Sequence, residues 1–88
     1  MSPTDAPPIS EELEDLVRTM VDYPEEVRIW EIPESGSVRL ELAVDPDDLG
    51  KVIGRQGRTA RALRALLDVR GDRDGARYEL QILEEDDL

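Results

Sequence analysis

Gly50-Lys51-Val52-Ile53-Gly54-Arg55-Gln56-Gly57-Arg58 is the stretch of this chain that says most about its function. Two of its glycines flank an Arg-Gln pair, apolar residues precede them, and an arginine-rich helical pattern follows. Glycine lets backbone N–H groups come close to a phosphate, because a Cβ atom would block the approach and resist a positive φ angle. Lys51, Arg55 and Arg58 add positive charge where an anion would lie. The stretch therefore predicts a glycine turn between two helices that binds a phosphate group.

The charges of this chain are unevenly distributed. The net charge of −11 argues by itself against a nucleic-acid partner. Residues 1–50 carry −11, residues 51–77 carry +5 and residues 78–88 carry −5, so the basic surplus surrounds the glycine turn. Physiological salt screens charges more than about 8 Å apart, and binding therefore depends on this local field. An arginine-rich helix alone would favour a role in solubility, but beside the glycine turn it favours an anionic ligand.

Composition excludes several classes of function. The chain has 88 residues, enough for one domain, with no cysteine and no histidine. It therefore lacks a disulfide framework, thiolate metal ligands and the commonest general base. The carboxylates of Asp45, Asp47 and Asp48 match no calcium-loop spacing and are explained by helix capping. We expect no enzyme activity, no metal or other cofactor and no small-molecule substrate.

The first eight residues are polar and rich in proline, and they lack the apolar segment of a signal peptide. No apolar run approaches the length of about 20 residues that spans a membrane. The simplest interpretation is a soluble cytoplasmic protein.

Three helices are predicted from apolar periodicity and from end signals. The first begins at Ser10, which can cap it, and ends before Tyr23-Pro24. Asp45-Pro46 begins a short second helix that ends at Gly54. The third runs from about residue 58 to residue 69.

Three strands are predicted, at residues 27–33, 37–44 and 76–83. Apolar and charged side chains alternate clearly along 37–44, as in a half-buried strand. Residues 34–36 form a hairpin loop, and residues 70–75 form a loop before the last strand.

The element order is therefore α-β-β-α-α-β within a domain at residues 9–83. A disordered tail at residues 1–8 precedes the domain, and an acidic tail at residues 84–88 follows it. Three strands with one apolar face each need helices on that face only, which predicts a two-layer α+β fold.

Residues 49–64, together with residues 21–27, resemble the small bacterial single-KH-domain RNA-binding proteins of the KhpA family. The similarity covers roughly residues 10–83. It implies a type II KH fold, with a three-stranded mixed sheet whose second and third strands are parallel. In such a module the Gly-x-x-Gly loop clamps about four nucleotides of a single strand.

The resemblance also implies roles for particular residues. The glycines 54 and 57 would shape the turn, while the side chains of residues 55 and 56 would contact the sugar-phosphate backbone. The full set of implied RNA-binding residues is Lys51, Val52, Ile53, Gly54, Arg55, Gln56, Gly57, Arg58, Ala60, Arg61, Arg70 and Arg73. Three of these, Val52, Ile53 and Ala60, would form an apolar groove wall, and Arg70 and Arg73 would close its far side. Val52 and Ile53 fit a plain core role equally well, and Arg61, like Arg64, fits a solvated helix face.

The family further implies homodimerisation and pairing with a larger KH-containing bacterial protein. Such a complex would act as an RNA chaperone or post-transcriptional regulator linked to cell-envelope growth and cell shape. Trp30 lies off the apolar alternation of the first strand and is a candidate interface anchor.

Two alternatives remain open. One alternative to the RNA-binding role is a protein-interaction module with weak RNA affinity, and the other is a duplex DNA-binding helix-turn-helix protein. An RRM is disfavoured, because the strands lack aromatic stacking residues and the chain has no phenylalanine.

Overall fold

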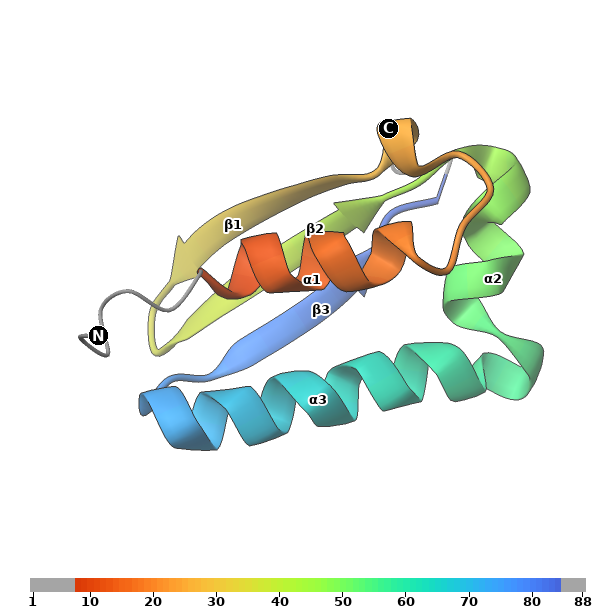
Figure 1. Ribbon diagram of the computed structural model, residues 1–88. Coiled ribbons are helices and arrows are strands. Elements are labelled where there is room, and N and C mark those ends of the chain that lie inside the picture. The colour runs from red at the N-terminus through yellow and green to blue at the C-terminus, as the bar shows by residue number, and fades with distance from the viewer. Residues whose placement is uncertain (1–7, 85–88) are drawn as a thin grey trace.

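The computed structural model describes residues 8–84 and shows one sheet covered by helices (Figure 1). Its elements are α1 (Ile9–Arg18), β1 (Arg28–Glu34), β2 (Ser37–Ala43), α2 (Leu49–Ile53), α3 (Arg58–Asp74) and β3 (Tyr78–Ile82). Short 3-10 turns lie at Pro24–Glu26, Pro46–Asp48 and Arg55–Gly57. The predicted element order is confirmed.

The sheet is mixed, and β2 lies at its centre. β1 pairs with β2 antiparallel through the hairpin at Gly36, while β3 pairs with β2 in parallel, with Leu40 opposite Leu80. Parallel strands cannot be joined by a tight turn, so the connection between them must be long. Here α2 and α3 provide it, and the α+β fold with parallel second and third strands is confirmed.

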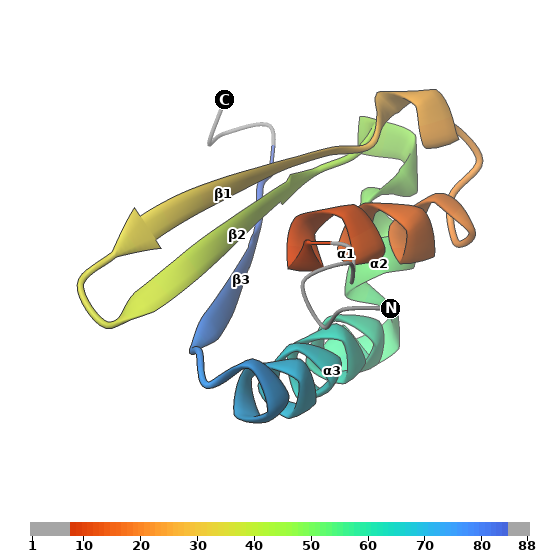
Figure 2. The ribbon, with the colours of Figure 1, turned by 60° about the vertical axis from the view of Figure 1, so that its left-hand side comes forward.

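One face of the sheet carries the core. Leu40 and Leu42 of β2 have no exposed surface, and α1 and α3 cover them. The helical residues packed there are Leu13, Val17, Leu63 and Leu67. Figure 2 shows both helices on the same side of the sheet.

The predicted start of the first helix was wrong. The Pro8 carbonyl accepts hydrogen bonds from the backbone N–H groups of Glu11 and Glu12, so α1 begins at Ile9 and no side chain caps it. This start buries Ile9 on the same face as Val17. Burying an isoleucine contributes about 1.5–3 kcal/mol, which outweighs a Ser10 cap of about 1 kcal/mol. The helix also ends at Arg18, well before Tyr23.

The predicted loop at residues 70–75 was also wrong, because α3 continues to Asp74. Gly75, with a φ of 67°, ends the helix in the left-handed conformation. Arg70 Nε donates to Asp74 Oδ2 at 2.9 Å, a pair with i,i+4 spacing that supports the last turn. Gly71 is buried beside the Ala76 carbonyl, where a Cβ atom would lie 2.5 Å from the oxygen. This glycine therefore permits close packing instead of marking a loop.

The predicted tails lie outside the described residues, except for Pro8 and Glu84.

Candidate nucleic-acid interface

The glycine turn joins α2 to the start of α3 (Figure 1). Its φ/ψ angles are 78°/169° at Gly54, 56°/25° at Gln56 and 73°/15° at Gly57. Gln56 is the one non-glycine residue with positive φ in the described part of the chain. Such a conformation costs about 1–3 kcal/mol and persists where surrounding structure enforces it, often at functional sites.

The two glycines of the turn are required for different reasons. At Gly54 a Cβ atom would lie 2.3 Å from Thr59 Oγ1, and these backbone angles are nearly closed to other residues. At Gly57 a Cβ atom would meet nothing within 4 Å, so only the left-handed backbone favours glycine. The space beside Gly57 is open, and a phosphate group can approach the backbone there.

Backbone donors and positive charge meet at this turn. No side chain caps the N-terminus of the 17-residue helix α3. Its first N–H groups and its dipole therefore favour an anion. Arg55 and Gln56 are exposed, and Arg58 Nη2 donates to Gln56 Oε1 at 3.2 Å. The turn can thus offer backbone N–H groups and two guanidinium groups to a phosphodiester.

Lys51 contacts two carboxylates. Its Nζ lies 3.0 Å from Asp22 Oδ2 and 3.5 Å from Asp48 Oδ1. Asp48 is fully buried, and its two oxygens accept hydrogen bonds from the backbone N–H groups of Asp22 and Tyr23 at 3.0 and 2.9 Å. This cluster attaches the start of α2 to the segment after α1. The positive charge of Lys51 is therefore balanced locally, and its main contribution is to support the turn.

Burial by itself raises the pKa of Asp48. The N–H donors of Asp22 and Tyr23 and the Lys51 ammonium group together outweigh this effect, so the pKa of Asp48 lies below the ordinary value of 3.8. The pKa of Lys51 is raised above 10.5, first by its hydrogen bond to Asp22 and then by the charges of Asp22 and Asp48. Both groups are therefore ionised at neutral pH.

Of the three residues expected to line an apolar groove wall, only Ile53 is half-buried. Val52 has no exposed surface and belongs to the core, and Ala60 is 5% exposed. The prediction that Val52 contacts a bound strand was wrong, because the short helix α2 turns this side chain into the core.

The remaining predicted contacts follow α3 away from the turn. Arg61 is exposed and makes no hydrogen bond or ion pair with any residue in 8–84. Arg70 and Arg73 lie about 20 and 24 Å along the helix from Gly57, at 1.5 Å per residue. Arg70 pairs with Glu12 of α1 and with Asp74. The structure does not bring Arg70 and Arg73 to the turn, because helix replaces the loop in which they were expected.

Asp74 also accepts a hydrogen bond from the Tyr78 hydroxyl at 2.7 Å. This bond lowers the pKa of Asp74, and the charge of Arg70 lowers it further. The same bond raises the pKa of Tyr78 above 10.0. The Arg70 side chain is thus part of a network that joins α1, α3 and β3.

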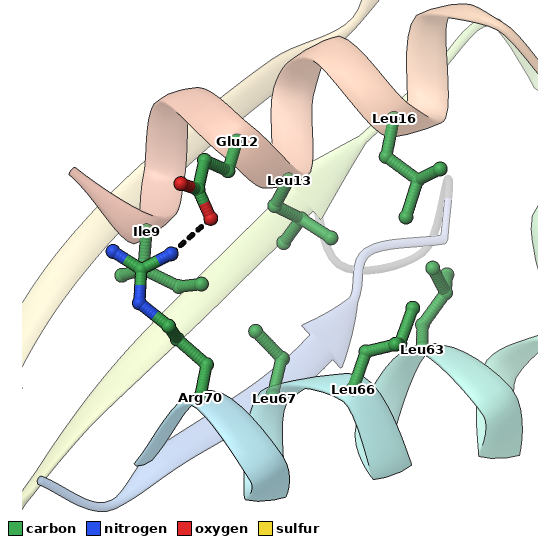
Figure 3. A pocket seen from close by; sticks show the side chains of 8 residues that line it. All are labelled: Ile9, Glu12, Leu13, Leu16, Leu63, Leu66, Leu67 and Arg70. Carbon is green, nitrogen blue, oxygen red and sulfur yellow. Dashed lines mark hydrogen bonds and ion pairs between the residues drawn. The ribbon is translucent and has the colours of Figure 1, made fainter. Parts of the chain in front are cut away.

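An apolar groove between α1 and α3 was not predicted. Ile9, Leu13, Leu16, Leu63, Leu66 and Leu67 line it, and the Glu12–Arg70 ion pair lies at one end (Figure 3). Leu66 is 56% exposed and Leu16 is 39% exposed. Both leucines lie at helical spacing from core residues, Leu16 from Leu13 and Leu66 from Leu63, but this periodicity cannot show that the two helices leave them uncovered.

Trp30 lies on β1, opposite Glu41, and is 46% exposed. It therefore lies off the core face, as the sequence pattern indicated.

Sequence reasoning also missed a contact of Arg64, whose Nη2 donates to the Leu80 carbonyl at 3.3 Å. No local signal could have indicated this contact between α3 and β3.

No group of three or more potential metal ligands is present among residues 8–84. Over the same residues, no helix is long and apolar enough to cross a membrane.

Comparison with known proteins agrees with this geometry. A sequence model of the KhpA/KhpB KH domain matches residues 10–82. The RNA-binding protein KhpA of Aquifex aeolicus is 51% identical over 67 residues, which are 76% of this chain and 85% of that protein. The proteins of the same name from Streptomyces coelicolor and Halalkalibacterium halodurans are 49% and 42% identical over 72 residues. Each of these two matches covers 82% of this chain, and they cover 90% and 95% of the relatives.

No solved structure gives a significant match. The family model spans nearly all of the described domain, and these relatives match over most of their own length. The chain therefore belongs to the KhpA/KhpB family of KH domains.

Proposed function

We propose that this protein binds short single-stranded RNA by clamping its sugar-phosphate backbone at Gly54–Arg58. The observation that carries the proposal is the turn itself, which combines positive φ angles with open space beside Gly57 at the uncapped N-terminus of α3. The three relatives described above are named RNA-binding proteins, which supports RNA as the ligand. The proposed activity is binding without catalysis.

In this proposal Arg55 and Gln56 contact the sugar-phosphate backbone, and Arg58 adds charge. Ile53 provides the accessible apolar wall, while Lys51 supports the turn. With three or four phosphate contacts on a single strand, the logarithm of the binding constant should fall with the logarithm of the salt concentration with a slope of about −2 to −3. The acidic remainder of the chain weakens long-range attraction, and we expect micromolar or weaker affinity for short RNA.

The test compares the wild type with an Arg55→Asp, Gln56→Asp double variant at two salt concentrations, with circular dichroism as the check on folding. A second double variant, Arg73→Asp with Ser35→Asp, changes the net charge by the same amount away from the turn. We expect the first variant to lose RNA binding and the second to keep most of it. Equal losses would mean that overall charge, and not the turn, governs binding.

Duplex DNA serves as the competitor in the same titration. We expect it to displace single-stranded RNA poorly, because α2 has only five residues and cannot form the first helix of a typical helix-turn-helix motif. Efficient displacement by the duplex would favour the DNA-binding alternative.

A second candidate function, protein interaction, is supported by the groove between α1 and α3. Its exposed leucines form an apolar strip between the acidic face of α1, with Glu11, Glu12 and Asp15, and the arginine-rich helix α3. Around a two-fold axis, α1 of one copy would lie near α3 of the other, so the surface is complementary to itself. We propose a second copy of this chain as the occupant, with a larger KH-containing protein as the alternative partner.

We propose that such a complex works on RNA in the cytoplasm of a bacterial cell. A role as an RNA chaperone or post-transcriptional regulator, including one in cell-envelope growth, is part of the proposal and depends on RNA binding.

A further inference from the structure

The strand β3 has one edge that no other strand covers, because the sheet order is β1-β2-β3. In this parallel pair, the Val38 N–H donates to the Arg77 carbonyl and the Leu83 N–H donates to the Leu42 carbonyl, both at 2.8 Å. Backbone groups of successive residues face opposite edges, so those of Leu80 face the uncovered edge. The Leu80 carbonyl accepts a hydrogen bond from Arg64 Nη2 at 3.3 Å.

A second depression lies along this edge, between α3 and β3. It is lined by Arg64, Asp68, Arg77, Tyr78, Glu79 and Leu80, and its volume is about 260 Å³. Pockets for drug-sized molecules usually measure about 300–1,000 Å³ and enclose their ligand. An open depression of this size suits a single flat base better than an enclosed metabolite. Arg64 is two helical turns, about 10 Å, beyond Gly57, within reach of a strand of about four nucleotides held at the turn.

Arg64 and Asp68 bring unused donors and acceptors to this depression. The guanidinium group has five N–H donors in a planar fork, and its one interaction with the described residues is the bond to Leu80. Asp68 lies one turn further along α3, on the same helix face, and its carboxylate has no partner within residues 8–84. An arginine and an aspartate at i,i+4 would ordinarily pair, but here the arginine reaches the strand and leaves the carboxylate open.

Guanine matches this arrangement among the four bases. It offers two neighbouring acceptors, O6 and N7, to an arginine fork, which is the commonest base-specific contact in protein–DNA complexes. It also carries two neighbouring donors, N1–H and N2–H₂, which a single carboxylate can accept together. Adenine, cytosine and uracil lack that pair of donors.

We propose that Arg64 and Asp68 select a guanine base next to the backbone clamp, with Arg64 donating to O6 and N7 and Asp68 accepting from N1–H and N2–H₂. This inference rests on the proposed RNA-binding function and extends it from backbone binding to base choice.

The experiment measures fluorescence anisotropy with RNA octamers of uridine in which one position is guanosine, adenosine or cytidine, scanned along the strand. We expect the wild type to bind the best guanosine octamer at least about fivefold more tightly than octauridine. Arg64→Gln should abolish the preference for guanosine and replace it with a preference for adenosine, because glutamine pairs with N6 and N7 of adenine. Arg61→Gln, the matched control, removes the same charge from the same helix and should weaken all octamers by one common factor.

Asp68→Ala should change two measured quantities in opposite directions. Loss of the negative charge should raise the affinity for octauridine, while loss of the acceptor should reduce the preference for guanosine over uridine. The same preference can be tested without changing the protein: 7-deazaguanosine removes the N7 acceptor and inosine removes the N2 amino group, and each should weaken binding severalfold. These RNA substitutions keep the test decisive if Arg64→Gln fails to fold.

A wild type that binds octauridine as tightly as every guanosine octamer would overturn the inference and leave the proposed function intact. An Arg64→Gln variant that weakens all octamers equally would also overturn it, because Arg64 would then act only through its charge or by covering the strand edge. If the wild type binds none of the RNAs, the proposed function itself fails, and the base-selection proposal fails with it.

Discussion

The backbone N–H of Tyr23 donates to Asp48 Oδ2 at 2.9 Å, although the two residues are 25 positions apart in the chain. Asp22 donates to the other oxygen of the same buried carboxylate. One side chain thus binds two backbone groups that lie between α1 and β1. Because Asp48 immediately precedes α2, these bonds fix the position from which the glycine turn begins.

Replacing Asp48 with Asn should therefore destabilise the fold, because the amide has one acceptor oxygen instead of two and no charge for Lys51. We expect the Tm to fall by about 4 °C or more. Asp47→Asn is the matched control: Asp47 is exposed, and a surface substitution of this kind usually changes stability by less than about 0.5 kcal/mol. Equal melting temperatures for the two variants would contradict the role assigned to Asp48.

The stabilising contribution of Asp48 should also depend on pH. Its pKa is lower in the folded state than the ordinary 3.8, so the ionised carboxylate stabilises the fold above about pH 4. This contribution is lost as the pH falls through 3.8 toward the folded-state pKa. The stability difference between the wild type and Asp48→Asn, measured by urea denaturation, should be largest near neutral pH and shrink as the pH falls below about 4. A difference that stayed constant over this range would show that ionisation of Asp48 is not what stabilises the fold.

Gly54→Ala should both destabilise the protein and weaken RNA binding. The new Cβ would lie 2.3 Å from Thr59 Oγ1 and 2.8 Å from the Thr59 backbone nitrogen, so a side-chain rotation alone cannot relieve the contact. We expect a loss of about 1–3 kcal/mol from the backbone conformation, with the clash in addition. Chemical denaturation and RNA titration measure the two effects.

Gly36→Ala is the control for this substitution. Gly36 also has a positive φ, 81°, but a Cβ atom there meets nothing within 4 Å, and the hairpin lies at the other end of the sheet from the turn (Figure 1). We expect a stability loss of about 1–2 kcal/mol and unchanged RNA binding. If Gly54→Ala lowered the free energy of unfolding no more than Gly36→Ala does, the contact with Thr59 would not contribute to the loss of stability.

Gly71→Ala should destabilise the protein, contrary to the usual effect in a helix. Alanine ordinarily stabilises a helix interior by about 0.5–1 kcal/mol relative to glycine. At Gly71, however, the Cβ would lie 2.5 Å from the Ala76 carbonyl oxygen. Gly50→Ala in α2 is the comparison, because a Cβ there meets nothing within 4 Å. Urea denaturation should place the two variants on opposite sides of the wild type, and a stabilised Gly71→Ala would refute the packing argument.

Two exposed surfaces are candidates for the proposed self-association, and one pair of variants distinguishes them. Leu66→Glu introduces charge into the groove between α1 and α3, whereas Trp30→Ala removes the exposed indole from β1. We expect the first to abolish dimer formation in analytical ultracentrifugation, and the second to leave it unchanged, with RNA binding kept in both. Loss of the dimer in Trp30→Ala alone would move the interface to the sheet.

Local sequence patterns were enough to predict the order of the elements, the single apolar face of each strand and the position of the glycine turn. These features are local: alternation along residues 37–44, the Asp45-Pro46 helix start and the two glycines all act on the backbone within a few residues. The Asp45 cap is a direct example, since its side chain accepts a hydrogen bond from the Asp47 N–H at 2.9 Å.

Which of the predicted site residues contact one another depends on the packing of the elements in three dimensions. Lys51 pairs with Asp22, Val52 is buried in the core, and Arg70 reaches Glu12 on another helix. The contact of Arg64 with Leu80 and the close approach of Gly71 to Ala76 likewise depend on how α3 packs against β3. These contacts involve partners that are distant in the sequence. Local periodicity specifies only which face of each element is apolar. Burial and hydrogen bonding stabilise the particular groups that packing of the helix and sheet layers brings into contact, and the sequence pattern does not show which groups these are.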